Sequence, residues 1–95
     1  MSGPTMVQVV TGRPHVIKNI AGKCILIHVR VNGNAAAALM SVANRDTTVV
    51  RGYQLLVGDY LSIDFSDWRD MWLKTDDAIP IFVDYWVSDE PISTR

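Results

Sequence analysis

Apolar and polar residues alternate with a period of two through most of the chain, which is typical of β-strands that bury one face. Residues 23–31 show this best: one face carries Ile25, Ile27, Val29 and Val31, and the other carries Cys24, Leu26, His28 and Arg30. The first face is entirely β-branched, and such side chains suit a packed sheet surface. We therefore expect this segment to be a central strand.

The same alternation recurs in short segments that are separated by turn residues. Segment 35–43 holds four consecutive alanines, which also favour a helix, but the turn before it favours a strand. Strands at such regular spacing, with no helical segment to make crossovers, predict an all-β protein: an antiparallel β-sandwich or jelly roll of about eight short strands. The expected strands are residues 6–10, 15–20, 23–31, 35–43, 47–50, 53–57, 60–65, 71–74 and 79–87.

Two dipeptides predict hairpins between neighbouring strands. Asn32-Gly33 tolerates the positive φ angles of a type I′ turn, and Gly58-Asp59 fits the glycine-first pattern of a type II′ turn. Pro80 has no amide donor, so the last strand is expected to begin at an edge or a bulge. Along that strand, one face carries Ile79, Ile81, Val83, Tyr85 and Val87, and the other carries Phe82, Asp84 and Trp86.

With 95 residues the chain is expected to form one domain, residues 1–95, with 1–5 and 89–95 as extended terminal arms. Residues 1–58 contain six basic and one acidic residue, whereas residues 59–95 contain three basic and nine acidic ones. Either the two halves interleave and their charges mix, or the surface is bipolar and copies associate through opposite charges.

Few residues offer chemistry. The single cysteine, Cys24, cannot form an internal disulfide, and with His15 and His28 it makes no recognisable set of metal ligands. Asp64, Asp67 and Asp70 lack the spacing of a calcium loop, so a solvated acidic loop is the simpler interpretation. No serine lies in a nucleophile-elbow motif, and we expect no catalytic residue, no metal and no cofactor.

Two classes of partner are disfavoured by the distribution of residue types. The basic residues form no dense run and accompany no nucleic-acid-binding motif, so nucleic acid is not expected as a partner. The longest apolar stretch, residues 35–40, is far shorter than the ~20 residues of a membrane span. The remaining expectation is a protein that binds another protein.

Six large aromatic residues can either fill the core or lie on a binding surface: Trp68, Trp72, Trp86, Tyr53, Tyr60 and Tyr85. Amphipathic aromatics suit a sugar-stacking platform, but so small a domain needs most of them for its core or for a subunit interface. The alternation directs Trp86 and Phe82 away from the core face. We expect Tyr60, Phe82 and Trp86 to contribute to a subunit interface or to an interface with another protein.

Residues 52–87 resemble small structural proteins of tailed bacteriophages. In that group a Leu-x-x-Gly-[Asp/Glu] turn precedes an alternating strand, a strand with Trp or Tyr, a polar turn and a final apolar-aromatic strand. The corresponding parts here are Leu55-Leu56-Val57-Gly58-Asp59, residues 60–64, Met71-Trp72-Leu73 and residues 81–87. The resemblance implies a capsid decoration, or cement, protein that is often a homotrimer and binds the major capsid protein.

This resemblance implies a protein that is made in the host cytoplasm and is located on the capsid surface of the virion. Three alternatives stay open. The first is a tail, neck or fibre component of the same kind of particle, and the second is a small carbohydrate-binding β-sandwich module, which requires an exposed row of aromatic rings. The third is a small hydrolase, which requires a cleft with convergent polar groups.

Overall fold

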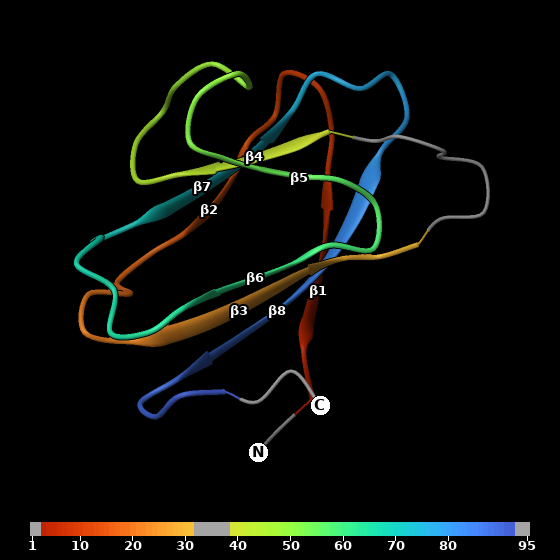
Figure 1. The fold of residues 1–95 in the computed structure, drawn as a ribbon. Coiled ribbons are helices and arrows are strands. Elements are labelled where there is room, and N and C mark those ends of the chain that lie inside the picture. The colour runs from red at the N-terminus through yellow and green to blue at the C-terminus, as the bar shows by residue number, and fades with distance from the viewer. Residues whose placement is uncertain (1–2, 32–38, 93–95) are drawn as a thin grey trace.

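The computed structural model describes residues 3–31 and 39–92, which contain eight strands and no helix (Figure 1). The all-β prediction is confirmed. The strands are β1 (Thr5–Val9), β2 (His15–Ile17), β3 (Cys24–Val29), β4 (Met40–Ala43), β5 (Tyr53–Leu55), β6 (Tyr60–Ile63), β7 (Met71–Thr75) and β8 (Ile81–Ser88). Within these described ranges there is accordingly no helix long and apolar enough to cross a membrane.

The strand pairing identifies the sandwich as a jelly roll. Each strand pairs antiparallel with its counterpart from the other end of the chain: β1 with β8, β2 with β7, β3 with β6 and β4 with β5. Pairings of β3 with β8 and of β4 with β7 then join these ribbons into two sheets. Sheet 1 has the order β1-β8-β3-β6 and sheet 2 the order β2-β7-β4-β5. Four antiparallel strand pairs that are arranged in this way in two sheets make the jelly-roll architecture.

Both predicted hairpins are wrong, because the strands on either side of each turn belong to different sheets. β3 pairs with β6 and β8, whereas β4 pairs with β5 and β7; the Asn32-Gly33 turn itself lies outside the described residues. Likewise β5 lies in sheet 2 and β6 in sheet 1. Among the eight strands described, β4 and β5 are the one sequence-adjacent pair that is hydrogen-bonded, as the jelly-roll order requires.

The turn at Gly58 is a link between the sheets, with a geometry different from the predicted one. The Asp59 amide donates to the Leu56 carbonyl at 3.0 Å, which places Gly58, at φ 90°, third in a four-residue turn. A positive φ at that position is the mark of a type II turn. The Leu56 amide donates to the Asp59 carboxylate at 2.9 Å, and the Gly58 amide donates to the Val29 carbonyl at 2.8 Å. The turn is thereby fixed at the end of β3.

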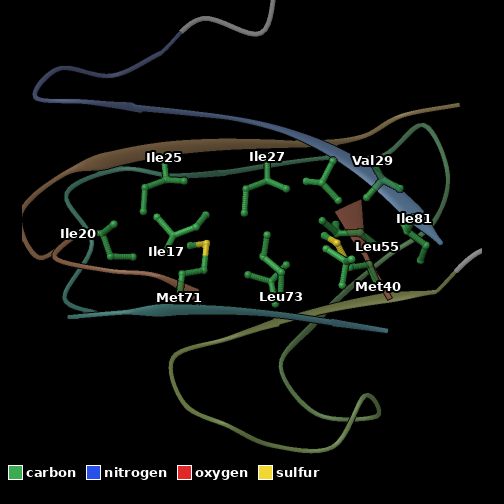
Figure 2. Packing of buried hydrophobic residues seen from close by; sticks show 13 residues of the cluster. Ile17, Ile20, Ile25, Ile27, Val29, Met40, Leu55, Met71, Leu73 and Ile81 are labelled. Carbon is green, nitrogen blue, oxygen red and sulfur yellow. The ribbon is translucent and has the colours of Figure 1, made fainter. Parts of the chain in front are cut away.

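Residues 47–50 are not a strand, although their β-branched composition predicts one. They lie in the 44–52 loop, which links β4 to β5 on the outer side of sheet 2 (Figure 2). Side chains of sheet 2 bind carbonyls of this loop: Ser41 donates to Arg51, Gln54 to Val49 and Lys74 to Thr47. These side-chain hydrogen bonds hold the loop against sheet 2, so the loop needs no backbone pairing with a neighbouring strand.

The core lies between the two sheets, where the inner faces of their strands meet (Figure 2). Ile25, Ile27 and Val29 of β3 are at most 1% exposed, as the alternation predicts, and β3 lies between β8 and β6 as expected of a central strand. The opposing sheet contributes Met40, Val42, Met71 and Leu73, none of which is exposed. A molecule 34 × 28 × 16 Å in extent is thin enough to hold only these two layers, since packed sheets lie ~10 Å apart.

Three residues assigned to the core faces are instead exposed. Val31 is 74% exposed because β3 ends at Val29, and Ile79 is 40% exposed because β8 begins only at Ile81. Val87, near the end of β8, is 42% exposed. The strand does start directly after Pro80, in agreement with the missing amide donor of that residue. The Ile79 amide donates instead to the Asp77 carboxylate at 2.9 Å, which makes this segment a turn.

The oppositely charged halves both contribute strands to each sheet. Sheet 1 alternates strands from the first half, β1 and β3, with strands from the second, β8 and β6. Three Lys or Arg ion pairs, Lys23–Asp89, Lys74–Asp46 and Arg30–Asp84, each join a residue before position 58 to one after it. The jelly-roll order therefore brings complementary charges together, as expected if the two halves mix.

Candidate functional site

The three residues expected at an interface, Tyr60, Phe82 and Trp86, all project from the outer face of sheet 1. Phe82 and Trp86 flank Asp84 at alternate positions of β8, and Asp84 lies beside His28 across the β8–β3 boundary. The ring of Tyr60 stacks on His28 with centroids 4.2 Å apart. Tyr60 is 51% exposed, whereas Phe82 and Trp86 are half-buried. The site residues thus share one surface, but two of them are partly covered.

A row of four side chains crosses the middle of this surface. The register places Met6, Asp84, His28 and Tyr60 side by side on β1, β8, β3 and β6. Asp84 is only 8% exposed and forms an ion pair with Arg30, whose Nε lies 3.2 Å from a carboxylate oxygen, and His28 Nδ1 lies 3.7 Å from the same oxygen. A carboxylate at this depth needs such partners, because an unpaired buried charge is costly. In this row the polar residues Asp84 and His28 lie in the middle, between Met6 and Tyr60 at the two ends.

A second row lies beside the first and is more apolar. Leu26 faces outward from β3 but is only 3% exposed, and Trp86 is directly opposite it on β8. Cys24, also on this face, is fully buried. Neither Leu26 nor Cys24 belongs to the cluster between the sheets. These side chains form a small outer cluster of their own, which the sequence pattern had placed on the face away from the core.

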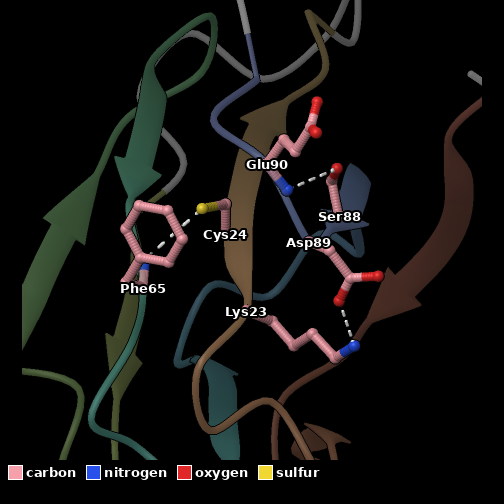
Figure 3. Close-up of polar contacts among 6 residues, drawn as sticks. All are labelled: Lys23, Cys24, Phe65, Ser88, Asp89 and Glu90. Atoms are coloured by element: carbon pink, nitrogen blue, oxygen red, sulfur yellow. Dashed lines mark hydrogen bonds and ion pairs between the residues drawn. The ribbon is translucent and has the colours of Figure 1, made fainter.

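The chain beyond β8 runs along the same side of sheet 1 as this outer cluster. It turns back on the side of sheet 1 that faces away from the core, and Ile92 in it is 9% exposed (Figure 2). At the turn, the Ser88 hydroxyl accepts a hydrogen bond from the Glu90 amide at 3.1 Å, and Lys23 pairs with Asp89 (Figure 3). The Phe65 amide donates to Cys24 Sγ at 3.4 Å nearby. The described part of the predicted second arm therefore packs on the domain.

Among the hollows formed by the described residues are a larger and a smaller one, and neither of these is lined by Tyr60 or Phe82. The larger, about 360 Å³, lies where the start of β1 and the end of β2 meet the far end of β8, and Tyr85 and Trp86 contribute to it. The smaller, about 180 Å³, lies between the 44–52 loop and Trp68. Its rim carries Arg45 and Arg51, and its wall carries Tyr53.

Three acidic residues of the second half accept hydrogen bonds from backbone amides. Asp70 accepts a hydrogen bond from the Asn19 amide at 3.2 Å, and Asp59 and Asp77 accept backbone amides in their own turns. Asp64 and Asp67 are exposed. Among residues 3–31 and 39–92, no three His, Cys, Asp or Glu side chains gather as metal ligands would.

The two histidines lie on different sheets. His28 is part of the outer row of sheet 1, whereas His15, on β2, lies 6.1 Å from the ring of Tyr85 between the sheet edges. Burial lowers the pKa of His15 below its usual value of 6.5. Burial disfavours the charged imidazolium, so His15 is held neutral near neutral pH.

The smaller hollow is the feature that sequence reasoning missed. Arg45 and Arg51 were counted only as scattered positive charges, and Tyr53 and Trp68 only as two of six aromatics. Their rings lie 5.9 Å apart at 41° in the structure. Trp68 lies fifteen positions after Tyr53, so no local sequence motif could predict that their rings lie close together.

The fold and surface define an all-β jelly-roll domain with a mixed aromatic and charged face on sheet 1. No family model, no curated protein and no solved structure matches the chain.

Proposed function

We propose that this jelly roll is a non-enzymatic structural protein of a virus particle, a capsid decoration protein that bridges neighbouring coat subunits through the outer face of sheet 1. The observation that carries the proposal is the composition of this face. It presents Met6, Tyr60, Phe82 and Trp86 around the Arg30–Asp84 pair. Met, Arg and large aromatics are the residue types enriched in protein interfaces.

The size and architecture of the domain are consistent with this role. The broad side of the molecule, 34 × 28 Å, is large enough for the roughly 800 Å² that each partner buries in a standard interface. Jelly rolls occur in viral capsid domains and also in lectins and cupins, so the fold supports the proposal only by analogy. The resemblance of residues 52–87 to phage structural proteins supplies the particular class of partner.

The mechanism is cross-linking by buried area. A half-buried aromatic residue such as Trp86 is already oriented by its neighbours, so little side-chain freedom is lost when a partner covers the remainder. Exposed Tyr60 and Met6, both just over half exposed, add apolar area at the opposite edges of the sheet. The protein associates with itself as a trimer and with the major capsid protein, at the capsid surface.

Quantitative mass spectrometry of purified particles tests the location. A decoration protein is present in as many copies as there are sites on the shell, whereas a tail, neck or fibre component is present in far fewer. Absence of the chain from particles would exclude both virion roles.

The interface itself is tested with a matched pair of variants. Tyr60→Ser removes an aromatic ring from sheet 1, and Tyr53→Ser removes one of equal exposure, 51%, from sheet 2. Light scattering after size exclusion should show a trimer for the parent chain and for Tyr53→Ser, and a shift toward the 10.6 kDa monomer for Tyr60→Ser. Equal occupancy of particles by both variants would contradict the assignment of sheet 1.

A further inference from the structure

The smaller hollow, called here the loop hollow, combines basic and aromatic side chains at one place on sheet 2. Arg45, Arg51, Asn44 and Thr47 supply hydrogen-bond donors from the 44–52 loop, and Tyr53 and Trp68 supply aromatic surface. A volume of about 180 Å³ is below the ~300 Å³ at which drug-sized ligand pockets begin. It suits a single ring or a small charged group.

Both arginines of the loop hollow lack a carboxylate partner among the residues that the structure describes. The nearest acidic residue in sequence, Asp46, is engaged elsewhere: it accepts a hydrogen bond from Lys74 Nζ at 2.6 Å. Both arginines lie on exposed positions, so their charge is not neutralised from within the domain. Two such guanidinium groups beside one hollow favour an anion, and they bind carboxylates and sulfates through paired N–H donors.

The loop that carries the arginines is fixed before any ligand arrives. Ser41, only 1% exposed, donates a hydrogen bond to the Arg51 carbonyl, and Lys74 donates to the Thr47 carbonyl. Gly52 lies so close to β4 that an added Cβ would overlap the Val42 carbonyl oxygen. A binding loop that is already ordered loses less conformational entropy on binding.

The two aromatic residues of the loop hollow, Tyr53 and Trp68, indicate which kind of molecule carries the acidic group. Trp68 packs against the core with its ring half-buried, and the Tyr53 ring lies 5.9 Å from it, half exposed. Aromatic rings with free faces bind the apolar faces of flat or ring-shaped ligands. We infer that the loop hollow binds a sugar ring that carries a carboxylate or sulfate group, with Arg45 and Arg51 on the acidic group and Tyr53 and Trp68 against the ring.

This inference is independent of the proposed virion role, because none of Tyr60, Phe82 and Trp86 lines the loop hollow. It is tested by titrating the ¹⁵N-labelled chain, observed by NMR, with four probes: methyl glucuronide, glucose 6-sulfate, methyl glucoside and inorganic sulfate. The two acidic sugars should shift the Trp68 indole signal and saturate. The neutral glucoside and the free sulfate should each bind roughly tenfold more weakly, because each lacks one half of the ligand.

Variants locate the site. Arg45→Gln and Arg51→Gln should each weaken both acidic sugars by roughly tenfold, and Tyr53→Ala should weaken the sugars but not inorganic sulfate. Arg13→Gln, at an exposed arginine that does not line the loop hollow, should leave binding unchanged. Equal binding of inorganic sulfate and acidic sugar would overturn the sugar assignment. No response to any probe, or unchanged binding by both loop arginine variants, would overturn the site.

Discussion

The Asp84 carboxylate, 8% exposed on the outer face of sheet 1, lies 3.2 Å from the Nε of Arg30. Arg30 is half exposed and follows the last residue of β3, so the pair ties the end of one central strand to the middle of the other. His28 Nδ1 lies 3.7 Å from the same oxygen. The stability of this surface therefore depends on keeping Asp84 paired.

Replacing Arg30 with Gln should lower the free energy of unfolding by about 1 kcal/mol, since the buried Asp84 carboxylate loses its ion-pair partner while half of the arginine is already in water. Arg45→Gln, at an exposed arginine without an ion-pair partner in the described chain, should change stability by less than about 0.5 kcal/mol. Urea denaturation measures both values. Arg30→Gln combined with Asp84→Asn should cost less than the sum of the single changes, and strict additivity would contradict the coupling.

Gly52 and Gly12 form a matched pair for a test of close packing. Both have positive φ, 84° and 78°, but a Cβ on Gly12 would meet open space, whereas one on Gly52 would overlap the Val42 carbonyl. Gly12→Ala should therefore cost only the backbone strain of about 1 kcal/mol, and Gly52→Ala clearly more. Thermal unfolding should show a loss of about 4–8 °C for Gly12→Ala and a larger one for Gly52→Ala. Equal losses would mean that the 44–52 loop is not pressed against β4.

The strands could be predicted from the sequence because alternation is a local property. The pattern of β3 fixes which side chains face the second sheet, and Ile25 and Ile27 are buried as expected. The pairing of strands could not be predicted in the same way. Gly58 permits a positive φ in a hairpin turn and equally in the type II turn that crosses between sheets, so the residue types do not distinguish the two. That choice is made by packing over the whole domain.

The candidate surface was only partly predictable for a related reason. Alternation correctly places Phe82 and Trp86 away from the core, and it places Leu26 and Cys24 on the outer face too, although both are buried there. The segment after β8 turns back on this outer side of sheet 1 and contains the buried Ile92, and no periodicity in β3 could predict its position. The loop hollow depends likewise on contacts between distant residues.

The burial of Ile92, in the segment after β8, leads to a third prediction. Ile92→Ser should destabilise the domain by about 1–2 kcal/mol, because burial of an isoleucine side chain is worth roughly 1.5–3 kcal/mol when complete. Val87→Ser, at a site 42% exposed, should have less than half of that effect. Hydrogen exchange should show faster opening of β3 and β8 in Ile92→Ser. Unchanged exchange and stability would show that the terminal segment does not contribute to the outer cluster.

The burial of His15 predicts a loss of stability in acid. Its pKa is lowered in the folded protein by burial, so the unfolded chain binds a proton more readily. The neutral form is therefore favoured by folding: the contribution is complete above pH ~6.5, the unfolded value, and decreases as the pH falls below it toward the lower folded pKa. His15→Gln keeps a neutral polar side chain beside Tyr85 and removes the titration. Urea denaturation at pH 7.5 and 5.5 measures the free energy of unfolding of the parent and of His15→Gln. Between these pH values the parent should lose more stability than the variant. A difference that is the same at both pH values would show that His15 is not kept neutral by its burial.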